Sequence, residues 1–314
     1  MNAESLLSAR STLGLVEAAR IIVDETDFVT IDDDRLAALL PAVADAQPIS
    51  WTWYLPSPDV GADEAAFHFA FNAGLNGGYF ALGPDHGIHQ WAIDGSGSRA
   101  LENWIAALRR DEMLPLIHLD TIEVLRRLPA RLNEIPHAQA RLDICADFAG
   151  TARRHHLSAL VSSCRTDGGY AFSLKTVDEL ARIYPAAFGA DPFRKKACLA
   201  IIMLAGYLHS AGHVVACDVP IPSDYQIPRI LLYVGALKPS GRLVELLTSD
   251  RLLSVTSWPV MALRAAALVA AHDLATMAGK PDGVIDGALF TTFRKDPDFR
   301  ANALPPMRCD SLWF

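Results

Sequence analysis

Residues 218–237, DVPIPSDYQIPRILLYVGAL, decide the fold because a proline-rich loop leads directly into a helix here. Pro228 suits the first helical position, since its ring fixes φ and it has no N–H group to donate. Apolar residues around it recur at helical spacing and predict a buried face: Ile227, Ile230, Leu231, Val234 and Leu237. Asp224 and Tyr225 are therefore expected in the loop just ahead of the helix.

Asp224 has two interpretations at this position. A carboxylate ahead of a helix caps its free N–H groups and is stabilised by the positive end of the helix dipole. On spacing alone, this capping role is the more common one. The alternative is a catalytic role. A fixed anion in a pocket can stabilise a sugar cation as a glycosidic bond breaks, or orient the attacking water.

Helical periodicity recurs along most of the chain. The expected helices cover residues 13–25, 34–46, 98–110, 121–128, 136–164 with a break near Gly150, 176–184, 192–211, 228–237, 241–250, 259–278 and 283–295. Gly212 and Gly279 follow apolar runs and are expected to end two of these helices.

The pattern changes between residues 49 and 93. Alternating and aromatic runs such as TWYL, FHFAF and GGYFALG predict short strands or extended segments, with glycine turns at residues 77–78 and 95–97. No repeat and no long linker interrupts the chain. The sequence therefore predicts a mainly α fold, one helical domain over residues 1–314 with a small β element near residues 50–95.

Composition excludes several classes of function. Hydrophobic residues make up 51% and charged residues 20% of the chain, as in ordinary soluble domains. The net charge is −8, which argues against duplex nucleic acid as a partner, because such surfaces are basic. The longest apolar run, residues 197–208, is too short to span a bilayer, so no membrane association is expected.

The cysteines and histidines indicate neither a disulfide framework nor a metal site. The five cysteines have no CxxC spacing, and reduced thiols in a cytoplasmic protein fit best. His209 and His213 are four residues apart, but the glutamate of an HExxH motif is missing. We therefore expect no metal.

Five blocks of the chain, taken in order, resemble the queuosine salvage family of queuosine 5′-phosphate N-glycosylase/hydrolases. SDYQIPRILLYVGALKPSGRL is similar to that family's Ala-Asp-Tyr-Arg-x-Pro-Gln block and the leucine-rich stretch after it. DPFRKKACLAI lies a similar distance upstream of it as the family's Lys-Arg-Ala-Gln segment. The other blocks are FHFAFNAGLNGGYF, SWPVMALRAAALVAAHDL with Arg264, and the closing PPMRCDSLWF.

The resemblance implies a mostly helical fold similar to helix-hairpin-helix DNA glycosylases. It also implies cleavage of the N-glycosidic bond of queuosine 5′-monophosphate, which releases queuine, a 7-deazaguanine base. A small nucleotide is then the partner, with no metal and no redox cofactor. We expect the protein to act as a monomer.

The family's functional residues map onto this chain by position. Its catalytic aspartate corresponds to Asp224, with Tyr225 beside it, and a phenylalanine that packs on the base falls on Pro222. A base-binding aspartate matches Asp286, whose interpretation without the resemblance is a solvated carboxylate after a turn. The family's neighbouring tyrosine is replaced by Gly287, and a second aspartate one turn later by Thr291.

Four further residues complete the predicted site. Tyr54 is nearest to the position of an early base-contacting histidine of the family, and Tyr79 lies in the family's asparagine-aromatic block. Both are otherwise ordinary core aromatics. Lys195 and Lys196 begin an apolar helix, where free N–H groups favour anions, so they are candidates for the 5′-phosphate. Basic residues beside a core helix are usually just solvated.

Three competing functions remain open at this point. One is the same reaction on a different base, because Pro222, Gly287 and Thr291 depart from the family pattern. Another is a non-catalytic protein that binds a nucleotide or base. The third, a DNA glycosylase, rests on fold similarity alone, and the acidic net charge counts against it.

Overall fold

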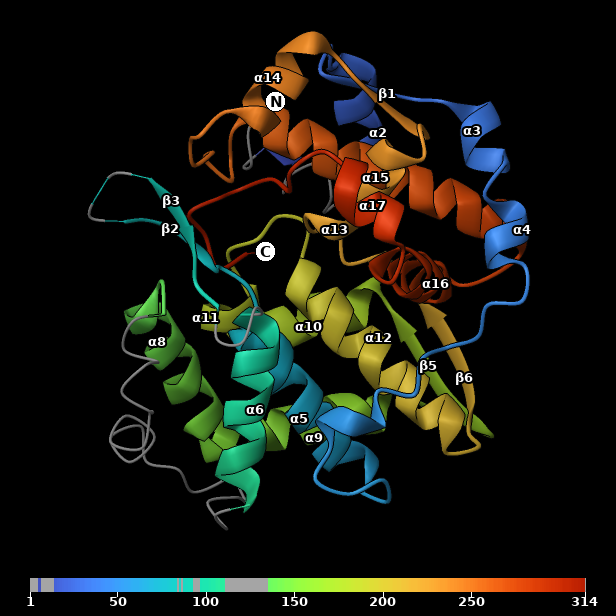
Figure 1. The fold of residues 1–314 in the computed structure, drawn as a ribbon. Coiled ribbons are helices and arrows are strands. Elements are labelled where there is room, and N and C mark those ends of the chain that lie inside the picture. Colours follow the sequence, from blue (N-terminus) through green and yellow to red (C-terminus); the bar gives the residue numbers. More distant parts are fainter. Residues whose placement is uncertain are drawn as a thin grey trace. The chain divides into compact units, whose positions relative to one another are not determined.

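The computed structural model describes residues 5–6, 14–83, 85, 87–92, 97–110 and 135–313. Of these residues, 59% are helical and 10% lie in strands, so the predicted mainly α class is confirmed (Figure 1). The chain forms two compact units. The first comprises residues 1–49 and 218–310, and the second residues 50–217 and 311–314. The single-domain organisation stays a prediction.

The first unit is built around one long helix, α15 (Trp258–Ala278), which packs against α2 (Leu15–Glu25). Its other helices are α3 (Asp33–Ala37), α4 (Leu40–Val43), α13 (Gln226–Tyr233), α14 (Gly241–Thr248), α16 (Asp282–Arg294) and α17 (Pro297–Asn302). Strands β1 (Val29–Ile31) and β7 (Leu237–Pro239) pair antiparallel, with Thr30 opposite Lys238. Helices α13 and α16 pack against each other and against α15.

Helix α15 is long and apolar enough to cross a membrane by length and composition. However, 78% of its most apolar window is buried inside the fold, and the Arg264 side chain in its second turn is fully buried. These are the properties of a core helix.

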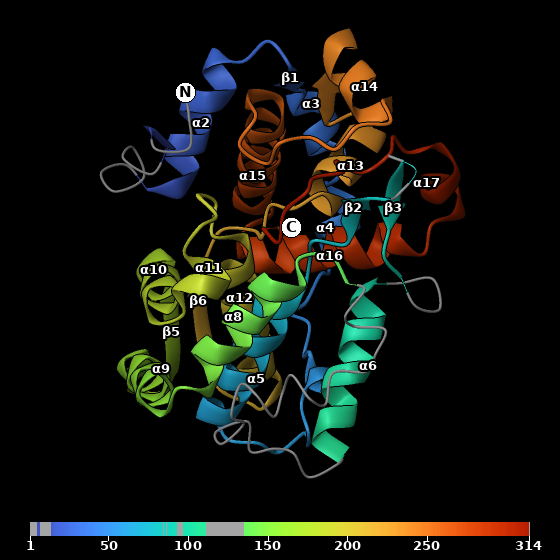
Figure 2. The same ribbon diagram turned by 90° about the vertical axis from the view of Figure 1, so that its left-hand side faces the viewer.

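The second unit has α5 (Ala62–Leu75) and α12 (Lys195–Ser210) at its centre, packed against each other. Helices α9 (Thr151–Ser163) and α10 (Leu174–Ile183) cover them on one side (Figure 2). The other helices are η1 (Thr52–Tyr54), α6 (Gly97–Arg110), α8 (Ala138–Ala149) and α11 (Pro185–Phe188). Strands β4 (Arg165–Thr166), β5 (Gly169–Ser173) and β6 (Val214–Asp218) form one sheet, and β2 (Phe80–Leu82) pairs antiparallel with β3 (Ile88–Gln90).

Most of the predicted helices are confirmed within a few residues. The predicted break near Gly150 separates α8 from α9, and Gly279 ends α15 with a φ of 62°. Residues 34–46 form two short helices rather than one, and the predicted helix over residues 121–128 lies outside the described residues.

The β element near residues 50–95 is confirmed only in part. The β2–β3 hairpin lies there, but FHFAF is helical and belongs to α5. The alternation of Phe67, Phe69 and Phe71 arises because α5 is buried on all sides, so apolar side chains are not confined to one helical face. TWYL forms the short helix η1, not a strand.

Candidate functional site

The loop before α13 holds Asp224 by a hydrogen bond to the helix start. The Oδ1 atom of Asp224 accepts the backbone N–H of Gln226, the first residue of α13, at 2.6 Å. The helix therefore begins two residues earlier than predicted, and Pro228 lies in its first turn, where a missing N–H costs nothing. The N-cap of α13 is Tyr225, which makes no side-chain cap, so the bond from Gln226 to Asp224 ties the preceding loop to the helix start. It also fixes the carboxylate, as a catalytic anion requires.

Ser223 locks the loop on the other side of Asp224. Its side chain is fully buried, and its Oγ donates to the carbonyl oxygen of Arg264 at 2.8 Å. In return, Nε of Arg264 donates to the carbonyl oxygen of Ser223 at 2.9 Å. Pro222, the predicted contact for the base, is buried in the same loop. Asp224 is half-buried and follows this rigid segment.

Tyr225 is the residue directly before α13. Burial, and next the negative charge of Asp224, raise the pKa of its phenol to about 12. The hydroxyl therefore keeps its proton at neutral pH and can donate a hydrogen bond.

Asp286 lies in the same unit as Asp224, on helix α16, and its side chain is buried with 8% exposure. Helix α16 packs against α13, which Asp224 precedes. A buried carboxylate is costly unless hydrogen-bonded groups surround it. The solvated-carboxylate interpretation of Asp286 is therefore wrong, and its role toward a base stays a prediction.

Gly287 and Thr291, the two positions of α16 that depart from the predicted family pattern, have different surroundings. A Cβ atom added at Gly287 would lie 2.9 Å from Cδ1 of Ile49, so Ile49 fills the space that a side chain at this position needs. Thr291 is exposed, and its Oγ1 donates to the carbonyl oxygen of Gly287 at 2.7 Å. Ile49 therefore lies beside the residue that follows Asp286.

The predicted aromatic contacts belong to the second unit. The hydroxyl of Tyr54 donates to Oε1 of Glu102 at 2.7 Å, and burial together with that carboxylate raises its pKa. The ring of Tyr79 is buried and stacks on Trp91, with centroids 6.0 Å apart, while its hydroxyl donates to Asn76. Both side chains therefore have partners within the second unit, where Tyr79 is buried and Tyr54 half-buried.

Lys195 and Lys196 also lie in the second unit, and both side chains are buried. Nζ of Lys196 donates to the carbonyl oxygen of Gly74 at 2.7 Å. The carboxylate of Asp191 accepts the N–H groups of Phe193 and Lys195 at the start of α12. This helix start therefore already contacts an anion from its own chain, and a phosphate contact of the two lysines stays a prediction.

The structure thus brings four of the eight predicted residues into the first unit and four into the second. Pro222, Asp224 and Tyr225 share one loop, and Asp286 is on a helix packed against α13. Sequence reasoning missed the part played by Ser223 and Arg264 in holding this loop. The available signal was an arginine within the apolar run of α15, since a charge there needs buried partners.

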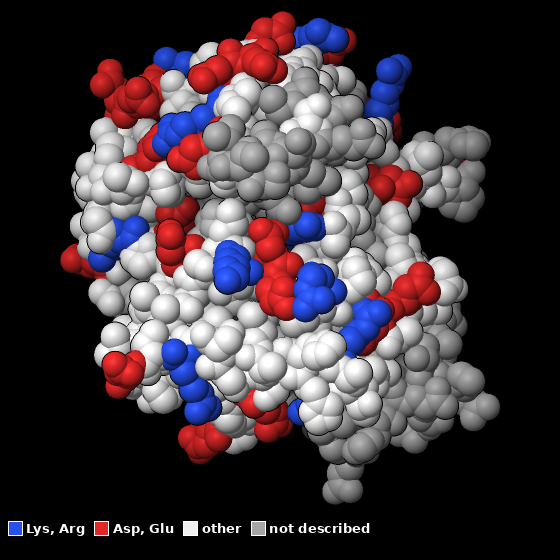
Figure 3. Space-filling model, turned by 180° about the vertical axis from the view of Figure 1, so that it is seen from behind, with Lys and Arg blue, Asp and Glu red and all other residues white. Residues whose placement is uncertain are grey.

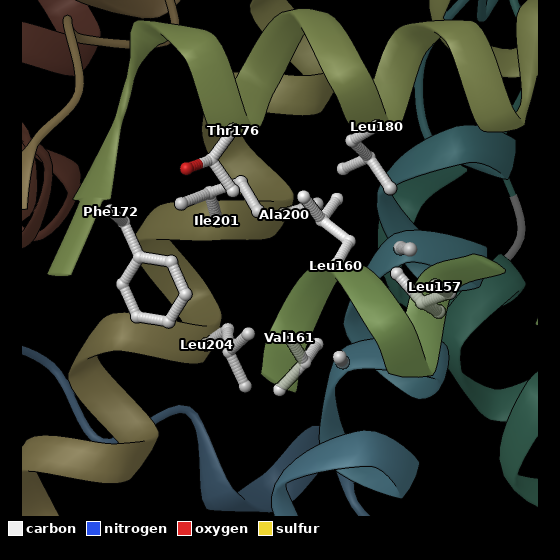
Figure 4. Close-up of a pocket in the computed structure, with 11 residues that line it drawn as sticks. Leu157, Leu160, Val161, Phe172, Thr176, Leu180, Ala200, Ile201 and Leu204 are labelled. Carbon is white, nitrogen blue, oxygen red and sulfur yellow. The ribbon is translucent and has the colours of Figure 1, made fainter. Parts of the chain in front are cut away.

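Two hollows in the second unit were also absent from the predictions. A cavity of about 10 Å³ lies among α5, α9, α10 and α12, with Leu157, Leu204 and Phe172 among its apolar lining (Figure 4). Its size and apolar lining make it a packing void rather than a ligand site. A wider groove of about 480 Å³ is lined by residues that include Asp59 and Tyr207, whose hydroxyl donates to the carbonyl oxygen of Val60.

The described part of the chain shows charges of both signs in Figure 3 and no cluster of metal-binding side chains. On the face in Figure 3, Lys and Arg are interspersed with Asp and Glu. No group of three or more His, Cys, Asp or Glu side chains is placed there to hold a metal ion, as far as the described residues extend. The five cysteines are free thiols, and four of them are buried.

Comparison with protein-family models and with curated proteins finds no match for this chain.

Proposed function

We propose that this chain hydrolyses the N-glycosidic bond of queuosine 5′-monophosphate, or of a related 7-deazapurine nucleotide, and releases the free base. The observation that carries the proposal is the fixed carboxylate of Asp224, bonded to Gln226 at the start of α13. The resemblance of five sequence blocks to the queuosine salvage family supports it. A monomeric, cytoplasmic enzyme without metal or redox cofactor, related in fold to helix-hairpin-helix glycosylases, belongs to the same proposal.

The chemistry of the reaction assigns a role to each carboxylate. As the C1′–N bond breaks, its electron pair goes to the base, and positive charge develops on the sugar. Asp224 stabilises that charge, either as an anion while water attacks C1′ or as a nucleophile that water later displaces. The water oxygen ends on C1′, and its proton neutralises the departing base.

Recognition of the base falls to the buried carboxylate of Asp286, which accepts hydrogen bonds from amino and ring N–H groups. The protonated phenol of Tyr225 supplies a donor, and Pro222 is the proposed apolar contact in the same loop. Base contacts of Tyr54 and Tyr79, in the second unit, stay predictions from the resemblance. A contact of Lys195 and Lys196, in the second unit, with the 5′-phosphate stays a prediction from the resemblance.

A different modified base is the second candidate substrate, and one observation favours it. Ile49 occupies the space beside Gly287, where the family carries a tyrosine, so the surroundings of Asp286 differ from the family pattern. A panel of queuosine, other deazapurine and ordinary purine 5′-monophosphates separates the two. Fastest turnover of an ordinary purine nucleotide would reject the queuosine assignment.

The decisive experiment incubates the purified protein with queuosine 5′-monophosphate and measures free queuine. Wild-type protein should release queuine, and Asp224→Asn should be at least about 100-fold slower, because it removes the anion at the developing charge. Asp296→Asn is the matched control, since Oδ1 of Asp296 makes the same contact, to the N–H of Asp298 at 2.8 Å. This control should keep wild-type activity.

Two outcomes argue against the proposal in different ways. Activity in Asp224→Asn equal to that of Asp296→Asn would remove Asp224 from the mechanism. No release by wild type, with nucleotide binding that Asp224→Asn alters, would identify a non-catalytic binding protein.

A further inference from the structure

Arg264 is a charged side chain in the interior of the first unit. It lies in α15 between Leu263 and Ala265, and its exposed fraction is 0%. A buried guanidinium carries five N–H donors and always keeps its charge, so it is tolerated only where acceptors surround it. Its position therefore reflects a specific set of contacts rather than general packing.

Arg264 makes two hydrogen bonds with Ser223, the residue directly before Asp224. Its Nε donates to the carbonyl oxygen of Ser223, and its own carbonyl oxygen accepts the Oγ hydrogen of Ser223. The N–H of Ser223 donates to the carbonyl oxygen of Ile221 at 2.9 Å. Hydrogen bonds thus hold both the backbone and the side chain of Ser223. Asp224 is the next residue along the chain, so the backbone of Ser223 sets where Asp224 begins.

The charge of Arg264 also reaches the C-terminal segment of the same unit. Burial raises the pKa of the Cys309 thiol to about 12, although the positive charge of Arg264 acts in the opposite direction. The thiol is therefore neutral at pH 7 and does not neutralise Arg264. A charge-assisted hydrogen bond from Nε to the carbonyl oxygen of Ser223 stabilises the guanidinium.

We propose that Arg264 is a positioning residue, which holds the Asp224 carboxylate in its reactive place through Ser223. This inference rests on the proposed function, because it assigns Asp224 the catalytic role. Catalysis depends steeply on geometry, and displacements of about 1 Å can cost on the order of 100-fold in rate. Loosening Ser223 should therefore slow the reaction without removing any group that touches substrate.

The amide of Gln226 reports the position of Asp224 independently of catalysis. First-turn N–H groups have no partner within their helix, so protection of this amide from hydrogen exchange depends on the Asp224 carboxylate. Exchange at Gln226 can be measured whether or not any substrate is known. Asp224→Ala serves as the reference for full loss of protection.

The test uses Ser223→Ala and Arg264→Lys in the full chain. Ser223→Ala removes only the Oγ contact, and Arg264→Lys keeps the charge but loses the fixed planar donor. Ser249→Ala and Arg300→Lys are the matched controls, because both side chains also donate to backbone carbonyl oxygens. Ser249 Oγ donates to that of Leu246 at 2.8 Å, and Arg300 Nε donates to that of Arg294 at 3.0 Å. Each variant is measured for kcat, KM, melting temperature and Gln226 exchange.

We expect the two test variants to exchange the Gln226 amide at least about tenfold faster. We also expect kcat to fall about 10- to 100-fold while KM changes less than about twofold. Both controls should match wild type. Unchanged Gln226 exchange overturns the inference, even where kcat or melting temperature falls, because that pattern indicates a purely structural role. If wild type has no glycosidase activity, the proposed function fails, and Gln226 exchange alone decides whether Arg264 positions Asp224.

Discussion

The side-chain amine of Lys196 donates a hydrogen bond of 2.7 Å to the carbonyl oxygen of Gly74, in the last turn of α5. The guanidinium of Arg141 donates to the carbonyl oxygens of Leu75 and Gly77 beside it. Carbonyl groups at a helix C-terminus lack intrahelical partners, so two buried side-chain donors satisfy this end of α5. Burial, and next the positive charge of Arg141, lower the pKa of Lys196 well below its usual value.

This lowered pKa predicts a pH dependence of stability. Folded Lys196 loses its proton at a lower pH than in the unfolded chain, so between the two pKa values the unfolded state binds more protons. The free energy of unfolding of wild type should therefore rise relative to that of Lys196→Met between pH 7 and 10. The rise is at most about 1.4 kcal/mol per pH unit, because one proton is involved.

Urea denaturation of both proteins across this range measures the difference. The neutral amine still donates to Gly74, so the hydrogen bond survives at high pH. Lys175→Met at an exposed position is the control and should show no such trend. A difference independent of pH would mean that folding does not disfavour the charged form of Lys196.

The sequence predicted the long elements well because helix starts and stops have local causes. Gly279 ends α15 in the left-handed conformation that glycine favours, and Asp224 marks the start of α13 by a contact two residues away. Strand β1 and its partner β7 were not predicted, since each has three residues and they pair across more than 200 positions of the chain. Periodicity in a window carries no information about such pairing.

The sequence predicted a site residue only where a reactive side chain stands at a recognisable position in the helical pattern. Asp224 and Tyr225 were found through their place before a helix, but the burial of Asp286 was not, because its neighbours come from other helices. The partnership of Ser223 with Arg264 joins residues 41 positions apart. The sequence contains both residues but gives no signal that they are in contact.

The void in the core of the second unit predicts an unusually costly substitution. Leu204 is 1% exposed and lines the cavity of about 10 Å³ (Figure 4). Leu204→Ala should lower the free energy of unfolding by about 2–5 kcal/mol, toward the upper end because the new space joins an existing one. Leu82→Ala, at a side chain 59% exposed, should change it by less than about 0.5 kcal/mol in urea denaturation. A loss below about 1 kcal/mol in Leu204→Ala would mean that the helices collapse into the space.

The contact between Gly287 and Ile49 predicts which side chains α16 accepts. Gly287→Ala should be nearly neutral, because the end of Ile49 can rotate away and alanine favours a helix by up to about 1 kcal/mol. Gly287→Tyr should destabilise the protein by about 1–3 kcal/mol or more through overpacking. Combining it with Ile49→Ala should recover part of that loss.

A double-mutant cycle by urea denaturation measures this coupling. We expect an interaction of about 0.5–3 kcal/mol between Ile49→Ala and Gly287→Tyr, as for residues in direct contact. Additive effects would show that Ile49 is not what excludes a larger side chain at position 287. Where the double variant is folded, its rate on queuosine 5′-monophosphate against wild type also tests the proposed effect of this position on base choice.

The pair formed by His272 and Asp282 predicts a second pH dependence, with the opposite sign. Nδ1 of His272 lies 3.1 Å from Oδ2 of Asp282, at the start of α16, and this hydrogen bond raises the pKa of the imidazole. The stabilisation is complete below the unfolded pKa of about 6.5 and is lost as the pH rises through the folded value. Wild type should therefore exceed His272→Gln in stability by more at pH 5 than at pH 8.5. The change should be no more than about 1 kcal/mol, because the side chain is one-third exposed and water screens the pair. His209→Gln, at an exposed position, is the control substitution in the same urea titrations. If wild type exceeded His272→Gln in stability by more at pH 8.5 than at pH 5, the raised pKa of His272 would be contradicted.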